Sequence, residues 1–352
     1  MTRDAVFMAP ALKGFASRVF QAFGVPEADA VKVASIMIDA DLYGLDTHGI
    51  FRLRQYANRL RDGGTNANPQ VTLARDFGAI AVIDGDNGLG HLAMDKAADL
   101  AIAKAAAFGI GWVGVRNGNH AGPATVYVTK ALERGQAALY GAVGSANHMP
   151  AWGGTDLLLG TNPLALAVPA GDSPAFVLDM ATSVAAAGKI KTLAQQDKPM
   201  PEGWMVGRDG LPLTDPKRQS EGFLLPIDGP KGYGLALGIG LLAGCLNGAA
   251  MGSDVVNFSS DTTSPTNTGQ FFMALCVDAF GDPDGFRQLV EKTFADLRGL
   301  QTLPGHAPVR IPGDRLSATR RERTANGIPL HPNLIRELDA IAAECRVPGL
   351  QS

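Results

Sequence analysis

The sequence has few cysteines and no excess of basic charge, and these shortages exclude several classes of protein. Its 352 residues include three widely spaced cysteines, an odd number that argues against a disulfide framework and favours a reducing compartment. With 31 Lys and Arg against 34 Asp and Glu, the chain lacks the basic patch of a nucleic-acid-binding protein. The first residues, MTRDAVFMAPALKG, contain no apolar signal-peptide core, so we expect a cytoplasmic protein.

Motifs for metal binding and for covalent hydrolysis are also missing. None of the six histidines forms an H-x-x-x-H or H-E-x-x-H pair, and no Cys-x-x-Cys occurs. The nucleophile elbow G-x-S-x-G is absent as well. The sequence therefore predicts no metal site and no serine hydrolase.

One uncharged run is long enough to imitate a membrane span. Residues 232–253, GYGLALGIGLLAGCLNGAAMGS, place glycine at every fourth position from Gly240 to Gly252, a spacing that lets helices approach closely. No basic cluster flanks the run, as the positive-inside pattern would require. We interpret it as one buried helix of a globular protein and expect no membrane association.

The pattern of apolar residues divides the chain into helical ends and a mixed centre. Helical spacing dominates the first 75 residues and returns after residue 283, whereas strand-like runs begin near residue 79 and alternate with helices such as 91–108 and 183–196. We expect a discontinuous α-helical domain built from 1–75 and 285–352. A central α/β domain, 76–284, would hold the catalytic and cofactor sites.

A weak dinucleotide fingerprint, GIGWVG, occurs at Gly109, Gly111 and Gly114. The Rossmann arrangement needs a strand before these glycines and a helix after them. Here the order is reversed, and Gly109 is better explained as the residue that ends a helix. Any nicotinamide cofactor would therefore be bound on a different plan.

The stretch DLYGLDTHGIFRLRQY carries the densest group of reactive side chains. Thr47 is placed to cap a helix that would run through HGIFRLRQYANRLRDGG, with His48 and Arg52 on one face. A histidine exchanges protons near neutral pH, and an arginine fork binds a carboxylate. A capping threonine beside a surface histidine and solvated arginines explains the same residues equally well.

Four further clusters allow a functional and a plain structural reading. His120 lies in a Gly/Asn loop between a strand and a helix, where it could act on a ligand or bond to a turn. Thr161 precedes Asn162-Pro in an ordinary turn. Asp179 could bind a ribose or cap backbone, with Lys189 in the helix that follows. Lys231 heads the glycine-rich helix, where it could contact a phosphate or only solvent.

The order of these clusters resembles one family. DLYGLDTHGIFRLRQY, NGNHAG, GTNPLALAVPAG, LDMATSVAAAGKI, KGYGLAL and IPGDR together are similar to the malate/L-lactate dehydrogenase family of non-Rossmann oxidoreductases, nearly from end to end. The resemblance implies an α/β (α+β) fold in which a mixed, largely antiparallel sheet accompanies the helical domain. It also implies an NAD- or NADP-dependent homodimer acting on a small 2-hydroxy or 2-oxo acid.

The resemblance also implies roles for individual residues. His48 matches the proton donor, Arg52 the ligand of the substrate carboxylate, Thr161 a substrate contact, and His120 a histidine with acid–base or cofactor-side duty. The positions that match cofactor contacts are Ser145, Asp179, Met180, Ala181, Lys231 and Gly232, with Gly313 and Asp314 matching more loosely.

Two positions depart from the family pattern, and both belong to the predicted catalytic set of His48, His120, Thr47 and Lys189. Many members have serine where this chain has Thr47. The imino-acid reductases have aspartate at the position of Lys189, so their serine–histidine–aspartate relay cannot form here. We therefore favour a 2-hydroxyacid dehydrogenase, with a Δ1-piperideine-2-carboxylate or Δ1-pyrroline-2-carboxylate reductase, or a non-catalytic protein, as the alternatives.

Overall fold

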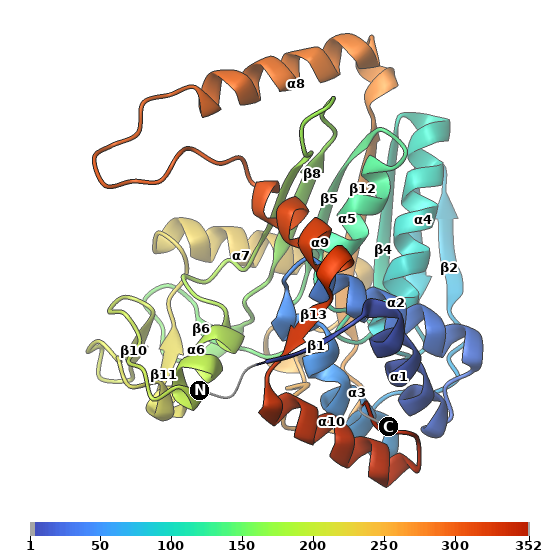
Figure 1. Cartoon of the computed structure of the whole chain (residues 1–352), viewed down its shortest axis with the longest axis vertical. Coiled ribbons are helices and arrows are strands. Elements are labelled where there is room, and N and C mark those ends of the chain that lie inside the picture. Colours follow the sequence, from blue (N-terminus) through green and yellow to red (C-terminus); the bar gives the residue numbers. More distant parts are fainter. Residues whose placement is uncertain (1–3, 351–352) are drawn as a thin grey trace.

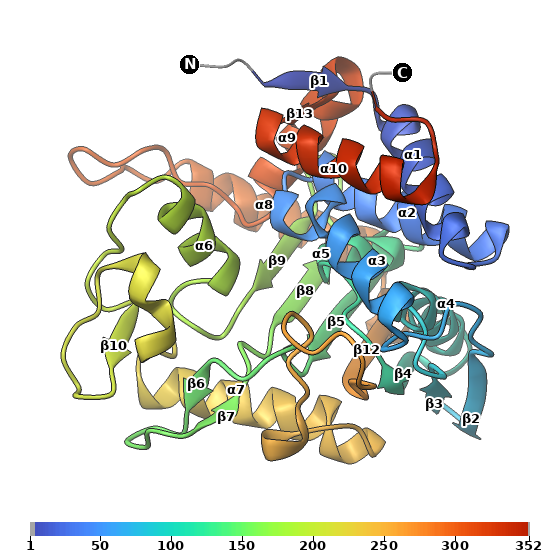
Figure 2. The same ribbon diagram turned by 90° about the horizontal axis from the view of Figure 1, so that it is seen from below.

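The chain folds into a layered sheet with a helical cluster against one end (Figure 1). The structure, a computed structural model, describes residues 4–350. The sheet and its helices take up the middle of the chain. The helical cluster combines residues 4–62 with the last helix, so segments from opposite ends of the sequence lie side by side (Figure 2).

Seven strands form one mixed sheet in the order β2-β3-β4-β12-β5-β8-β9. Only β3 and β4 run parallel, and the other five neighbouring pairs are antiparallel. This confirms the prediction of a mixed, largely antiparallel, non-Rossmann sheet. The strands are β2 (Thr72–Phe77), β3 (Ile80–Asp84), β4 (Ile110–Gly118), β5 (Gln136–Ala142), β8 (Leu164–Val168), β9 (Phe176–Met180) and β12 (Thr268–Cys276).

Helices cover both faces of this sheet. On one face, α4 (Gly90–Phe108) and α5 (Thr125–Leu132) pack against β4, β12 and β5, and alanines of α4 allow a close approach. On the other face lies α7 (Pro230–Ala243), where the rings of Trp112 and Phe271 stack at 4.4 Å. Because successive side chains of a strand point to opposite faces, the strands contribute apolar side chains to a core on each face of the sheet.

The glycines of the GIGWVG motif have packing roles. Gly109 has φ +83° and ends α4, as predicted, with its N–H bonded to the Ala105 carbonyl at 2.8 Å. A Cβ at Gly111 would overlap the backbone of Ala101 in α4, and one at Gly114 would overlap the side chain of Asn247. These residues therefore let the sheet meet its neighbours closely, which leaves no Rossmann phosphate turn here.

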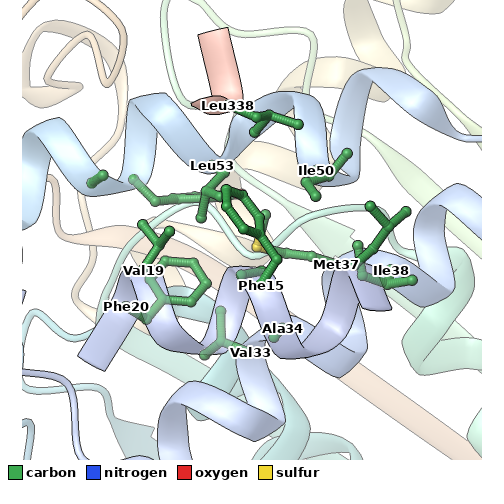
Figure 3. Close-up of a cluster of buried hydrophobic side chains, with 14 of the residues drawn as sticks. Phe15, Val19, Phe20, Val33, Ala34, Met37, Ile38, Ile50, Leu53 and Leu338 are labelled. Carbon is green, nitrogen blue, oxygen red and sulfur yellow. The ribbon is translucent and has the colours of Figure 1, made fainter. Parts of the chain in front are cut away.

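The helical cluster encloses its own hydrophobic core. Phe15 and Phe20 of α1 (Ala9–Ala22) interleave with Met37 of α2 (Glu27–Leu42), Leu53 of α3 (Leu53–Asp62) and Leu338 of α10 (Pro332–Cys345) (Figure 3). A short ladder, β1 (Ala5–Phe7) with β13 (Ile328–Leu330), ties the two ends of the chain together. Where the two domains divide along the chain stays a prediction.

The remaining elements flank these two layers. α8 (Pro283–Arg298) extends along the sheet end that carries the β8–β9 turn (Figure 1). Ser173, in this turn, donates hydrogen bonds from its N–H and hydroxyl to the carboxylate of Glu291 in α8. α9 (Asp314–Asn326) packs against α2. A smaller lobe contains β6 (Met149–Pro150), β7 (Leu157–Leu159), α6 (Ala187–Gln195), β10 (Met205–Gly207) and β11 (Gly222–Leu224), and the 3₁₀ turns are η1 (Asp46–His48), η2 (Ile50–Arg52), η3 (Pro216–Glu221), η4 (Cys245–Asn247), η5 (Gly252–Asp254) and η6 (Val277–Phe280).

Three predicted helices have different bounds in the structure. The helix expected from Thr47 begins only at Leu53, because Gly49 (φ −89°, ψ −141°) leaves helical geometry between the turns η1 and η2, and Thr47 caps no helix. The helix expected over 183–196 begins at Ala187. The glycine-rich helix expected over 232–253 ends at Ala243, where Gly244 leaves helical geometry. No helix within residues 4–350 is long and apolar enough to cross a membrane.

Candidate active site

A cavity of about 320 Å³ lies where the helical cluster meets the sheet. Its wall brings together segments from all the predicted clusters of the first 190 residues, many of them glycine or alanine. The lining residues are Leu45, Thr47, His48, Arg52, His120, Ala121, Gly122, Pro123, Ala124, Tyr140, Ala142, Val143, Gly144, Ser145, His148, Thr161, Pro163, Asp179, Met180, Ala181, Ala186, Ala187, Gly188, Thr268 and Gln270.

A second hollow, of about 370 Å³, opens between Trp152, Arg208 and Phe223. It is the more open of the two, and its described wall contains no histidine and no carboxylate. Proton transfer needs a titratable group beside the reacting atom. The chemistry predicted from the sequence therefore belongs to the first cavity.

A buried carboxyl group forms a hydrogen bond with the loop that carries His48 and Arg52. Asp41, which is 1% exposed, accepts a hydrogen bond from the Ile50 N–H at 2.8 Å. A Cβ on Gly49 would overlap the same carboxyl group, so only glycine fits between the two turns. Burial raises the pKa of Asp41 well above its ordinary value. The bend of the loop is thus built on one aspartate and one glycine.

Arg52 reaches the cavity with its guanidinium already oriented. Its Nε donates to the Thr47 carbonyl at 2.8 Å, and its Nη1 donates to Gln55 Oε1 at 2.6 Å. Guanidinium has five N–H donors, so three remain for a ligand. Burial lowers the pKa of Arg52 from its ordinary value, yet arginine keeps its charge in proteins. The arrangement suits a carboxylate, which a planar fork binds in two places.

Two histidine rings face each other beside this arginine. The rings of His48 and His120 are 5.6 Å apart and 19° from parallel. Burial, and then the charge of Arg52, lowers the pKa of His48 to about 4. Burial is also the main cause that holds the pKa of His120 well below its ordinary range, with Arg52 and His48 adding to it. Both imidazoles are therefore neutral at pH 7.

Another part of the cavity wall comes from the ends of β5 and β9 and from the segment before β8. Asp179 accepts bonds from the N–H and hydroxyl of Thr125, at 2.8 and 2.7 Å, and so caps the start of α5. Asn162, which is fully buried, ties this wall to α7 by accepting from Gly144 N–H and donating to the Ala236 carbonyl, both at 2.8 Å. The hydroxyl-bearing Ser145 also lines this wall.

This wall fits a nicotinamide ring. Its small alanine and glycine side chains leave room for a flat ring, and the hydroxyls of Ser145 and Thr161 could form hydrogen bonds to a carboxamide or ribose. Met180 and Ala181 lie at the end of β9, next to Asp179. His48 and His120 line the same cavity, so a ring bound here would share it with them.

Five of the predicted site residues do not line the cavity. Lys189 is the third residue of α6, and its ammonium lies over the ring of Trp204, 4.7 Å from the centroid. Lys231 is exposed and paired with Asp228 at 2.9 Å. Gly232 packs against the backbone of Ile227. Roles for these residues stay predictions, as do those of the residues that line the cavity.

The last two, Gly313 and Asp314, open α9. Gly313 has φ +109°, and a Cβ there would overlap the carbonyl of Ala175. Asp314 is bonded to Arg298 at 2.8 Å and to the Ile311 N–H at 2.9 Å. These contacts explain both residues as parts of the α9 start.

Sequence reasoning missed three residues that support the site. Asp41 holds the His48 loop, Tyr56 bonds to His120, and His91 packs edge-on against Tyr56 with ring centres 5.1 Å apart. The spacing of Tyr56, four residues after Arg52, was a usable signal for a shared helix face. Among residues 4–350, no cluster of three or more His, Cys, Asp or Glu side chains is placed to hold a metal ion.

The profile of the malate/L-lactate dehydrogenase family matches residues 7–339. The chain belongs to this family. It is 36% identical over 347 residues to the malate dehydrogenase of Pyrococcus horikoshii, covering 96% of this chain and 95% of that protein. The structure of sulfolactate dehydrogenase from Methanocaldococcus jannaschii superposes with a TM-score of 0.90 at 34% identity, over 99% of both chains.

Members of the family are not all named for hydroxy acids. The Δ1-pyrroline-2-carboxylate reductase of Ancylobacter novellus is 32% identical over 321 residues, covering 91% of this chain and 92% of that protein. All three relatives are oxidoreductases, and the family makes this chain an oxidoreductase that uses a nicotinamide cofactor. The resemblance seen in the sequence is thereby confirmed.

Proposed function

We propose that the protein transfers hydride between NAD or NADP and a small 2-hydroxy or 2-oxo acid. The observation that carries this proposal is the presence of an oriented guanidinium and two neutral imidazoles in one cavity. A carboxylate on Arg52 would hold the neighbouring C2 oxygen near His48 and His120. The relatives named malate and sulfolactate dehydrogenase act on acids with this arrangement of groups.

Each group has a separate task. Arg52 binds and orients the acid through its three free N–H donors. When bound, the nicotinamide supplies or accepts the hydride at C2. His48 exchanges the proton of the C2 oxygen, with His120 as the second candidate, and such general acid–base help contributes roughly 10²–10⁴-fold to the rate.

The deciding experiment compares His48→Ala with His120→Ala. With a panel of 2-oxo acids and either NADH or NADPH, the wild type should oxidise the cofactor, followed as the loss of absorbance at 340 nm. His48→Ala should lose kcat by at least ~100-fold while keeping its affinity for the cofactor. Retention of the wild-type kcat would show that His48 is not the proton carrier. The same panel separates NAD from NADP preference.

Reduction of a cyclic imine is the second candidate, favoured by the similarity to the pyrroline-2-carboxylate reductase. Arg52 could bind the carboxylate of such an imine as well. Lys189 argues against it, because the imino-acid reductases need an aspartate there and this ammonium lies over Trp204, outside the cavity wall. Adding Δ1-piperideine-2-carboxylate to the panel tests the choice directly.

We also propose a cytoplasmic homodimer. The resemblance implies a dimer, and α8 with its flanking segments exposes large apolar side chains that a second copy could cover. These side chains are Phe280, Leu289, Leu297, Leu300 and Leu303. Light scattering on the purified chain should give twice the mass of 36.7 kDa, and a monomer would refute the proposal.

A further inference from the structure

A buried tyrosine lies directly behind the second histidine of the site. Tyr56, from α3, is 1% exposed and its ring is held by His91 on one side and Phe258 on another, with ring centres 5.1 and 5.8 Å away. Its hydroxyl lies 2.6 Å from Nδ1 of His120. This packing leaves the hydroxyl facing the imidazole, so the pair forms a fixed contact.

A second contact decides which atom carries the proton. The backbone N–H of Gly122 also points at Nδ1 of His120, at 3.4 Å. An amide N–H can only donate, so Nδ1 must be the unprotonated, accepting nitrogen. The Tyr56 hydroxyl, which can donate or accept, then donates as well. Since a neutral imidazole has one N–H, the proton of His120 is on Nε2.

We propose that Tyr56 is a positioning residue that locks neutral His120 in its Nε2–H form. The position of the proton on His120 does not depend on the proposed function, but the consequence for catalysis does. In this form His120 offers a hydrogen bond to the C2 oxygen of a bound acid and polarises it. It cannot accept a proton at Nε2, so the proton released from a 2-hydroxy acid goes to His48 while the hydride goes to the nicotinamide.

The charged and titratable groups around His120 support the lock. Burial and then the charge of Arg52 disfavour a positive charge on its ring, and His48 and His91 would add to this only if they were protonated. His91 is fully buried, has no hydrogen-bond partner on either nitrogen, and is held neutral by burial, which lowers its pKa to about 3. Burial also raises the pKa of Tyr56, so its hydroxyl keeps its proton. Within residues 4–350, every group that acts on the pKa of His120 lowers it.

Nitrogen-15 NMR of histidine-labelled full-length protein tests whether the proton of His120 is on Nε2. Comparison with His120→Gln identifies the signals of His120 among the six histidines. We expect a protonated Nε2 and an unprotonated Nδ1 that do not change between pH 5 and 9. A protonated Nδ1, an equal mixture of forms, or titration of His120 near pH 6.5 would overturn the proposal.

Tyr56→Phe removes only the hydroxyl and keeps the ring between His91 and Phe258. Because a donor to Nδ1 favours the neutral ring, its loss should raise the pKa of His120 and mix the two forms. Turnover of the acid should fall roughly tenfold, consistent with one lost hydrogen bond. Tyr127→Phe is the control, since it removes a buried hydroxyl bonded to the Ala121 carbonyl at 2.6 Å instead.

The outcomes separate this proposal from the proposed function. If Tyr56→Phe leaves the form and pKa of His120 unchanged, Tyr56 is not the positioning residue. If Tyr56→Phe does not fold, the spectrum of the wild type still decides where the proton is. If no 2-oxo acid is reduced by the wild type but His120 shows the Nε2–H form, the lock stands and the assigned reaction is wrong.

Discussion

Replacing Arg52 with lysine tests the carboxylate clamp most directly. The guanidinium is oriented by the Thr47 carbonyl and Gln55 and keeps three N–H donors for a ligand. Lysine keeps the charge but has a single rotating ammonium group, so it cannot form two parallel bonds to a carboxylate. At least one charge-assisted bond to the acid is lost in the variant.

The size of the effect follows from that one bond. A hydrogen bond to a charged group contributes about 1.5–3 kcal/mol, which is roughly a 10- to 150-fold change in an equilibrium constant. We therefore expect the KM for the 2-oxo acid to rise by this factor in Arg52→Lys. The affinity for NADH or NADPH, measured by fluorescence titration, should change little because Arg52 is not among the residues that match cofactor contacts.

Arg54→Lys is the matched control. Arg54 is two residues further along, and its guanidinium pairs with Glu344 at 2.6 Å on the protein surface. Its KM should equal that of the wild type within twofold. An unchanged KM in Arg52→Lys, or an equal rise in both variants, would refute the assignment of Arg52 as the carboxylate ligand.

Two further predictions concern stability. Gly49→Ala should lower the free energy of unfolding by about 1–3 kcal/mol, because the added Cβ would overlap Asp41. Gly238→Ala is the control and should not lower this free energy, because the space around Gly238 is open. Chemical denaturation measures both variants. His91→Phe should flatten the acid response of Tm. Burial lowers the pKa of His91 in the folded protein to about 3, whereas its pKa in the unfolded chain is about 6.5. The folded state therefore loses up to about 1.4 kcal/mol of stability per pH unit as the pH falls below about 6.5. A His91→Phe variant with the wild-type pH slope would contradict this.

Local patterns in the sequence were enough for the broad architecture. The order of helix, glycine and strand around Gly109 excluded the Rossmann arrangement, because a helix C-cap and a phosphate turn need opposite orders of elements. The motif order from His48 to Lys231 indicated the family. Its known fold predicted the largely antiparallel sheet, which the strand pairing confirms.

Local patterns failed where distant residues control the backbone. Helical spacing after Thr47 predicted one continuous helix, but the carboxyl group of Asp41 takes the Ile50 N–H and forces a bend at Gly49. Asp41 lies nine residues before Ile50, so a pattern of a few neighbouring residues does not reveal this contact. The glycine-rich run was likewise predicted too long, because no local signal marks Gly244 as the residue where the helix ends.

The sequence by itself therefore determined the inventory of the site: an arginine, two histidines and small residues on a mixed α/β frame. Only the tertiary structure decided that His48 and His120 face each other, that Tyr56 lies behind His120, and that Lys189 lies over Trp204. The physical reason is the range of the forces involved. Turn and helix propensities act over a few residues, whereas the packing of α3 against the His120 loop joins segments far apart in the chain.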